Sequence, residues 1–392
     1  MTLPLDGIAV LDFGQGVAGP YCGQLLADQG ASVIKVEPPR GDWAREMGAR
    51  DAEDRSGLSG TFASVNRSKR GLCLDMKLPE ARTIARRLAQ RSDVVLESFR
   101  PGVMDRLGLG CDELRRDNPR LVYCAVTGFG ESGPNVDLPA GDSTMQAYGG
   151  LMSIVGERGG LPLRVGNVVS DMLAGMNAFS GVLLALLRRA ASGQGARVGV
   201  SLLDSLVAFQ APPLTEYLLT GVLPERQGSQ HPLIAPSGAV RTRDGTIVYT
   251  VLDHQWTRFC DGLGVPGLVN DARFAASALR QQNRAELAAA LAPVFAQRGS
   301  RDWLVRLREL DILCAPINDY ASLREDAQVV HNRLIGSAQG VPSIRNPVRI
   351  GGEAEHRPPP ARGEHTRDIL ANELKMTAAE IERLEALGAA LH

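Results

Sequence analysis

Short apolar runs alternate with helical stretches through the N-terminal third of the chain, and this alternation constrains the fold more than any other feature. The run Gly7–Gly14 leads into a glycine-rich turn, a helical stretch Pro20–Ala31 that ends at Gly30, and a second apolar run, Ser32–Glu37. A strand, a helix and a strand within about 30 residues predict a βαβ unit with parallel strands and a right-handed crossover.

The same alternation continues downstream and predicts a Rossmann-like, doubly wound parallel sheet. The remaining expected elements are strands at Leu72–Met76, Asp93–Phe99 and Arg120–Phe129, and helices at Pro79–Arg91 and after Pro101. A further helix, Met172–Ala191, is small and apolar around most of its circumference, which favours a core or interface position.

The composition shifts to turn residues and polar groups after residue 220, which indicates a second domain. We therefore expect a large α/β domain at 1–220, a linker at 221–237 and a smaller α+β domain at 238–317 that opens with a hairpin at Arg243–Gly245. Residues 318–392 are expected to form a linker and a C-terminal segment that returns to the large domain. That segment includes an amphipathic helix, Ala378–Leu391.

Charge, leader and cysteine patterns exclude several classes of protein. The 43 Lys and Arg nearly cancel the 44 Asp and Glu, so the charge indicates neither nucleic acid nor a membrane surface as a partner. No secretory pattern opens the chain, and the apolar stretch Phe179–Leu187 is too short to span a bilayer, so we expect a cytoplasmic protein. The six cysteines are scattered without a C-x-x-C, which favours reduced thiols and no metal site.

Gly14–Gly19 matches the G-x-G-x-x-G pattern of dinucleotide-binding proteins, and Glu37 stands where a ribose-binding acid is expected. An NAD(P)-dependent dehydrogenase is therefore one alternative. The other is that these glycines permit a tight turn and close helix packing, with the helix N-terminus available to any phosphate.

Seven segments in sequence order resemble the class III CoA-transferase family of the CaiB/BaiF type, which includes formyl-CoA transferase and carnitine CoA-transferase. They are Val10–Pro39, Asn66–Lys77, Glu97–Gly110, Asn118–Pro134, Asp142–Gly156, Val165–Leu186 and Gly193–Ser205. The resemblance implies an enzyme that moves CoA between carboxylic acids through an anhydride on an aspartate, which here is Asp171. The residue pattern alone favours a helix N-cap role for Asp171, and the resemblance favours catalysis; in either role the helix dipole is expected to keep it ionised.

The resemblance also places the contacts to the CoA ester, which is the expected substrate, with no permanently bound cofactor. Arg100 and Arg106 suit phosphate oxygens, although an arbitrary arginine is more often a solvated surface charge. Val17 and Pro38 depart from the Gln and Arg of formyl-CoA transferase. The implied contact residues are Val17, Ala18, Leu72, Cys73, Leu74, Asp75, Ser98, Phe99, Arg100 and Arg106.

Further candidates surround the expected nucleophile. Asp142 aligns with a carboxylate near the family's active site, and Gln146 lies four residues on, on the same helix face; the alternative for Asp142 is a surface acid at a helix start. Gly149 and the loop near His231 are expected to exclude water from the anhydride. Arg45, Arg67 and His231 are candidates to bind the distal carboxylate of a dicarboxylic acid.

The resemblance also covers α-methylacyl-CoA racemases, which need a base on each face of the α-carbon. They carry a histidine before the aspartate at a position that is Gly141 here, so a base is missing. A non-enzymatic CoA-binding protein is a further alternative. We expect a transferase that uses succinyl-CoA and a C4–C5 dicarboxylate such as itaconate, mesaconate or citramalate; the glycine-rich lid of the oxalate enzymes is absent. An interlocked homodimer is implied by the same resemblance.

Overall fold

The computed structural model describes residues 3–48, 58–350 and 356–392. The chain divides into a large unit, Met1–Leu151, Val165–Leu218 and Val330–His392, and a small unit, Met152–Arg164 and Leu219–Val329. The sequence-based boundaries differ from these units: residues 318–329, expected in the linker and returning segment, belong to the small unit, and so does Met152–Arg164, which was expected in the large domain. Met152–Arg164 groups with the small unit because Arg226 donates hydrogen bonds to the carbonyls of Ser153 and Gly160.

A seven-stranded sheet forms the centre of the large unit, and its order is β12-β3-β2-β1-β4-β5-β6. Six strands are parallel, whereas β12 is antiparallel to β3. The order of the parallel strands is that of a Rossmann-type sheet, so the predicted fold class is confirmed. The strands are β1 Ala9–Asp12, β2 Ser32–Glu37, β3 Arg70–Leu74, β4 Val94–Glu97, β5 Val122–Thr127, β6 Arg197–Ser201 and β12 Ala390–Leu391.

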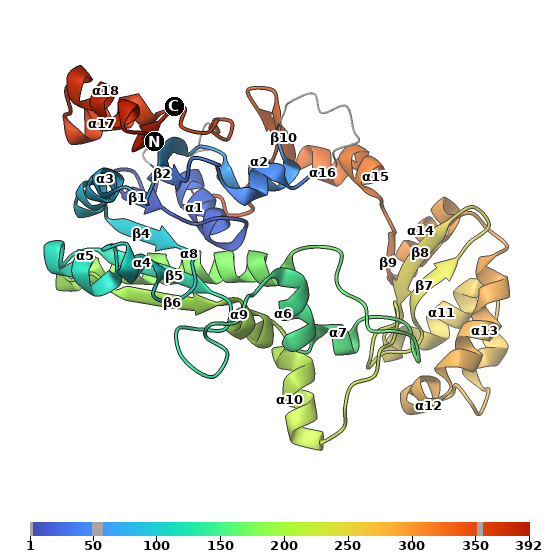
Figure 1. Ribbon diagram of the computed structural model, residues 1–392. Coiled ribbons are helices and arrows are strands. Elements are labelled where there is room, and N and C mark those ends of the chain that lie inside the picture. The colour runs from blue at the N-terminus through green and yellow to red at the C-terminus, as the bar shows by residue number, and fades with distance from the viewer. Residues whose placement is uncertain (1–2, 49–57, 351–355) are drawn as a thin grey trace. The chain divides into compact units, whose positions relative to one another are not determined.

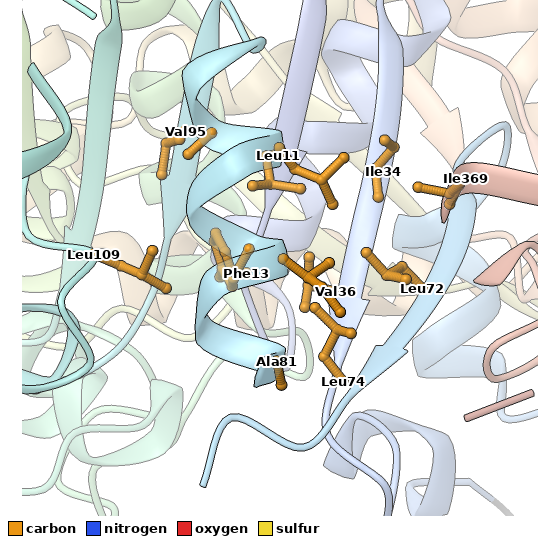
Figure 2. Close-up of a cluster of buried hydrophobic side chains, with 14 of the residues drawn as sticks. Leu11, Phe13, Ile34, Val36, Leu72, Leu74, Ala81, Val95, Leu109 and Ile369 are labelled. Atoms are coloured by element: carbon orange, nitrogen blue, oxygen red, sulfur yellow. The ribbon is translucent and has the colours of Figure 1, made fainter. Parts of the chain in front are cut away.

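Helices cover both faces of this sheet. On one face, α1 (Ala18–Asp28) and α8 (Val169–Ser192) pack against each other, and α8 also lies against β5 and β6 (Figure 1). On the other face, α3 (Pro79–Gln90), α5 (Cys111–Asp117) and α17 (Thr366–Leu374) close an apolar core. Figure 2 shows the centre of this core, where Leu11, Ile34 and Leu72 from three adjacent strands meet Ile369.

Helix α8 is long and apolar enough, by length and composition, to cross a membrane. That is weak evidence for a membrane span, because the core helix of a globular protein meets the same criteria. In this structure α8 packs against α1, α9 (Leu202–Phe209) and the sheet, as expected for a core helix. Helix α8 is longer than the apolar stretch Phe179–Leu187 because small and polar residues extend the helix at both ends.

The C-terminal segment belongs to the large unit and completes its sheet. Helix α18 spans Ala378–Ala386, so the expected helix to Leu391 is too long. It ends because Gly388 has a φ of 71°, after which β12 pairs with Leu74 and Cys73 of β3. This antiparallel strand covers an edge that would otherwise be open.

The remaining elements of the large unit are short and lie mostly in the connections. They are η1 Trp43–Glu46, α2 Gly60–Asn66, α4 Val103–Arg106, α6 Asp142–Tyr148, α7 Leu151–Ile154, α10 Ala211–Thr220, α16 Ala327–His331, β10 Ile335–Ala338 and β11 Val341–Ile344. Of these, α7, α10 and α16 cross a boundary between the units.

The small unit is an α+β structure with its own core. A three-stranded antiparallel sheet has the order β7-β8-β9, and the predicted hairpin turn lies between β7 and β8. Trp256, Phe259 and Trp303 pack in an aromatic core behind it. Its elements are β7 Ser237–Arg241, β8 Thr246–Thr250, β9 Leu313–Pro316, η2 Asp253–Gln255, α11 Trp256–Leu263, η3 Pro266–Val269, α12 Ser277–Gln282, α13 Arg284–Phe295, α14 Ser300–Glu309 and α15 Tyr320–Glu325.

Candidate active site

Asp171 is the third residue of α8, within its first turn. The N-cap position belongs to Val168, so the N-cap alternative for Asp171 is wrong. Within residues 3–48, 58–350 and 356–392, the Asp171 carboxylate has no hydrogen bond or ion pair. A partly buried carboxylate without a partner has the lone pairs that a nucleophile needs.

Asp142 lies beside the start of α8 and holds it in place. It is the first residue of α6 and only 7% exposed, so the surface-acid alternative is wrong. Its Oδ1 accepts hydrogen bonds from Ser170 N and Ser170 Oγ, both at 2.9 Å. Asp142 therefore fixes the residue next to Asp171.

Gln146 is fully buried one turn further along α6. Its Nε2 donates to Asp142 Oδ2 at 2.7 Å and to Asn167 O at 3.0 Å, and its Oε1 accepts from Val165 N at 2.8 Å. The expected pairing of Asp142 with Gln146 on one helix face is confirmed. The Gln146 amide contacts Asp142 and the backbone of the segment that leads into α8. Its role is therefore to position that segment.

Burial raises the pKa of the Asp171 carboxyl to about 7, and the neighbouring Asp142 carboxylate acts in the same direction. The sequence-based expectation that the helix dipole keeps Asp171 fully ionised is therefore wrong. Loss of water and a nearby like charge outweigh the dipole at this position. Near neutral pH, Asp171 exists as a mixture of carboxylic acid and carboxylate.

The start of α1 lies against α8 close to Asp171. Gly175 is one turn after Asp171, and a Cβ atom at Gly175 would lie 2.8 Å from Ala18 O. Only glycine permits this approach of the two helices. The approach brings Val17 and Ala18, two of the predicted CoA contacts, to the region of the candidate nucleophile.

Several predicted CoA contacts gather where the strand order reverses, between β1 and β4. Ligands of doubly wound sheets bind at the carboxyl ends of the strands at such a point. Ser98 Oγ follows β4 and accepts from Gln15 N at 2.9 Å, which joins the two strand ends, and the adjacent Phe99 N donates to Glu97 Oε2 at 2.7 Å.

Leu72, Cys73 and Leu74 also reach this edge of the sheet, but their side chains are fully buried in the core. Their contribution to a CoA site is therefore limited to the backbone. Cys73 N already donates to Thr366 Oγ1 at 3.1 Å, and Asp75 N donates to Ala389 O at 3.1 Å.

Arg100 and Arg106 are exposed. Arg106 ends α4, and Arg100 NH1 donates to Asp137 O at 3.4 Å. Neither guanidinium is used in an ion pair that the structure shows within its described residues, so both remain predicted phosphate contacts. Arg100 and Arg106 are exposed to solvent, whereas the side chains of Arg189 and Arg280 are buried.

Arg45 is already engaged by other groups. It pairs with Glu37 through two hydrogen bonds of 2.7 Å, donates to Pro360 O at 3.0 Å and stacks on Phe62. The hypothesis that Arg45 binds a substrate carboxylate therefore conflicts with its contacts, and the same holds for Arg67, which pairs with the buried carboxylate of Asp28. The pairing with Arg45 occupies Glu37, which is buried, so the acid required by the dehydrogenase alternative is unavailable to a ribose.

Gly149 and His231 lie in different units. Gly149 ends α6, where a Cβ would lie 2.9 Å from Leu206, so glycine is needed there for packing. His231 is exposed in the small unit, and its Nδ1 accepts from Leu233 N at 3.1 Å. Their proposed shielding role stays a prediction.

Three residues of this region escaped sequence analysis, namely Ser170, Lys35 and Lys69. Ser170 gave no signal, because a serine at a helix start is common. Lys35 did give one, because it interrupts a buried apolar strand and charged groups are buried only when paired, whereas Lys69 lies in the polar run Asn66–Arg70 and gave none.

Comparison with known proteins identifies the family. The model of CoA-transferase family III matches residues 5–366. Succinate–glutarate CoA-transferase of Agrobacterium fabrum is 35% identical over 94% of this chain and 95% of its own length, and succinyl-CoA–D-citramalate CoA-transferase of Chloroflexus aurantiacus is 34% identical over 98% and 97%. The crystal structure of a CaiB/BaiF family protein from Brucella suis is 34% identical, with a TM-score of 0.88 over 95% of this chain and 99% of that chain. The resemblance found in the sequence is thus confirmed, and this chain belongs to CoA-transferase family III.

Proposed function

We propose that this enzyme transfers CoA from succinyl-CoA to a short dicarboxylic acid, with Asp171 as the nucleophile. The observation that carries the proposal is the position of Asp171, which is partly buried and unpaired within the described residues. It lies beside the start of α1, in a chain that belongs to a CoA-transferase family. The proposed acids follow from relatives whose names include succinate, glutarate and citramalate.

The reaction conserves the thioester through two exchanges on Asp171. The carboxylate attacks the thioester carbonyl, so the acyl group forms a mixed anhydride with Asp171 and CoA leaves as thiolate. The thiolate then attacks the Asp171 carbonyl, releases the first acid with one aspartate oxygen, and leaves an aspartyl thioester. The acceptor acid repeats these steps in reverse and leaves one of its own oxygens on Asp171.

Asp142, Gln146 and Ser170 act by positioning Asp171, whose pKa is raised by burial and, in addition, by the Asp142 carboxylate. Their hydrogen bonds fix the first turn of α8. Desolvation makes the Asp171 carboxylate a stronger nucleophile than one in water, because the charge lacks a hydration shell. A pKa about 7 keeps roughly half of the enzyme in the reactive form at neutral pH.

A screen with matched acids tests the function. The enzyme is incubated with succinyl-CoA and, separately, glutarate, citramalate, itaconate, mesaconate or oxalate, and the thioester products are measured by mass spectrometry. We expect CoA esters of one or more C4–C5 dicarboxylates and little oxalyl-CoA. No product with any acid, or a preference for oxalate, would contradict the proposal.

The racemase alternative is tested in the same preparation. Gly141 caps the start of α6 and supplies no proton acceptor beside Asp142. In deuterated water, an α-methylacyl-CoA is therefore expected to keep its α-hydrogen. Exchange of that hydrogen would favour a racemase.

We further propose a homodimer, supported by apolar side chains that one face of α8 leaves exposed. Met176 is 49% exposed, Leu184 67% and Leu187 70%, and their spacing places them along one stripe of the helix. If the two chains interlock, the dimer separates only on unfolding. Sedimentation at nanomolar concentration is expected to show dimers only, whereas a reversible monomer–dimer equilibrium would exclude interlocking.

A further inference from the structure

The loop between β1 and α1 is held by buried side chains of two neighbouring strands. Gly14 N donates to Asp12 Oδ1 at 2.8 Å. Gly14 O accepts a hydrogen bond from Lys35 Nζ at 2.7 Å. Both backbone polar groups of Gly14 are therefore occupied by side chains, one from β1 and one from β2.

Asp42 secures the next part of the loop. Its Oδ1 accepts from Gly16 N at 2.9 Å, and its Oδ2 lies 2.8 Å from Lys35 Nζ. Lys35 and Asp42 are fully buried and pair with each other, so a single ion pair holds both Gly14 and Gly16.

Lys69 holds the other end of the same connection, where α1 begins. Its ammonium group makes three hydrogen bonds, to Asp12 Oδ2 at 2.8 Å, Pro20 O at 2.7 Å and Asn66 Oδ1 at 2.9 Å. Three donors therefore meet three acceptors. Burial lowers the pKa of this ammonium to about 8, while the Asp12 carboxylate opposes the shift.

This loop network, which we define as Asp12, Lys35, Asp42 and Lys69, carries no net charge. It contains two ammonium groups and two carboxylates, joined at 2.8 Å in the pairs Lys35–Asp42 and Lys69–Asp12. A neutral network adds no long-range attraction for phosphate. Its effect on a ligand must therefore be geometric.

The backbone approaches the loop network so closely that movement of the network displaces the loop. A Cβ at Gly14 would lie 2.8 Å from Asp12 Oδ1, and a Cβ at Gly23 would lie 2.7 Å from Asp12 Oδ2 and 3.1 Å from Lys69 Nζ. The glycines of the loop and of α1 thus serve contact with the buried charges.

The network does not use the first N–H groups of α1, at Ala18 and Gly19, or the N–H group of the N-cap residue Val17. The first N–H groups of a helix have no intrahelical partner, and they favour anions. They lie at the carboxyl end of β1, where the strand order reverses.

We propose that Lys35 and Lys69 are positioning residues for the CoA ester, which hold the loop so that the first N–H groups of α1 meet its phosphates. The inference rests on the proposed function for the identity of the ligand. Lys35 and Lys69 do not touch the ester, and they act through the backbone of Gly14, Gly16 and Pro20.

The variant Lys69→Met tests this, with Arg189→Met as the matched control. Arg189 is also buried and pairs with Asp93 at 2.9 Å, and Asp93 accepts from Ala9 N at the amino end of β1, at the opposite edge of the sheet. We expect Lys69→Met to weaken CoA binding, measured by calorimetry with CoA itself, and to raise KM for succinyl-CoA, each about tenfold, with kcat changed less than about threefold. Arg189→Met should lower the melting temperature and leave the Kd for CoA unchanged.

The double variant Lys69→Met/Asp12→Asn separates positioning from stability. It leaves no unpaired buried carboxylate, and the new amide oxygen still accepts from Gly14 N, but Pro20 O and Asn66 lose their donor. We expect the melting temperature to recover relative to Lys69→Met while the Kd for CoA stays raised.

A Kd that returns to the wild-type value in the double variant, or that never changed in Lys69→Met, would overturn the positioning role. Wild-type protein that binds no CoA would instead overturn the proposed function, and this inference with it. The calorimetric measurement needs no turnover, so the two failures are distinguishable.

Discussion

The starts of α1 and α8 lie beside each other on one face of the sheet, yet the carboxylates buried near them differ in whether a positive charge pairs with them. At α1, Asp12 and Asp42 each pair with a buried ammonium group. At α8, Asp142 accepts hydrogen bonds from the neutral donors Ser170 and Gln146, and Asp171 has no hydrogen bond within the described residues. Paired charges give a rigid loop, whereas an unpaired one gives a carboxylate with a raised pKa.

The size of the effect at α8 follows from the pKa of Asp171. The rise from 3.8 to about 7 corresponds to at most about 4 kcal/mol of lost preference for the charged form. The carboxylate is only partly buried, so the true cost is smaller. The fold tolerates this cost at Asp171, which is consistent with the trade of stability for reactivity at functional sites.

Replacing the unpaired carboxylate should give the largest effect. Asp171→Ala removes the nucleophile and leaves the phosphate contacts, so we expect turnover to fall by at least about 10³-fold. The Kd for CoA, measured by calorimetry, should stay within about twofold of wild type. Turnover within tenfold of wild type would place the chemistry at another residue.

The pH dependence of kcat/KM should report the ionisation of Asp171, because this carboxyl group must be ionised to attack the thioester. We expect kcat/KM to rise with pH through an apparent pKa about 7 and then to level off. Asp142→Asn removes the neighbouring negative charge, so the rise should move to lower pH. A profile whose acid limb is the same in wild type and Asp142→Asn would show that Asp142 does not act on the charge of Asp171.

A smaller effect is expected from Gln146→Leu. This variant removes the hydrogen bonds of the Gln146 amide and does not change the charge of any residue. Because Asn167 and Val165 lose their partner, the start of α8 should loosen, and kcat should fall about tenfold with KM for succinyl-CoA nearly unchanged. Gln146→Glu keeps an acceptor for Val165 N but places a second carboxylate against Asp142 Oδ2, so its activity should fall further than that of Gln146→Leu. Full activity in Gln146→Leu would show that the Gln146 amide does not set the position of Asp171.

The smallest effect concerns stability. The pKa of Asp171 is raised in the folded protein, so ionisation costs stability as pH rises from about 4 to 7, and the cost is complete above pH 7. Asp171→Asn should therefore be more stable than wild type at pH 8 by about 1–2 kcal/mol and nearly equal to it at pH 4.5. Chemical denaturation at the two pH values measures this, and an equal difference at both would contradict the assigned pKa.

The parallel sheet was predictable because each of its βαβ steps has a local pattern. The hairpin turn at Arg243–Gly245 was predictable for the same reason. Strand β12 was not, since it has two residues and exists only because the edge of β3 is available to it. The assignment of Met152–Arg164 to the small unit also depends on contacts with residues far along the chain.

Prediction of the site failed where the outcome depended on a partner. Arg45 had the right chemistry for a carboxylate, but the sequence does not show that its carboxylate is Glu37. Asp171 was identified through resemblance to the family, while its raised pKa depends first on its burial in the fold and then on the position of Asp142. Lys35 was visible as a charge in an apolar strand, yet its role depends on a loop 21 residues away.

Isotope transfer shows directly whether the carboxylate of Asp171 takes part in the thioester exchange. The enzyme is turned over with succinyl-CoA and glutarate whose carboxylate oxygens are ¹⁸O, then digested, and the peptide that contains Asp171 is weighed. We expect a gain of about 2 Da for each oxygen passed from the acid to Asp171. Formation of glutaryl-CoA with no label in that peptide would contradict this expectation.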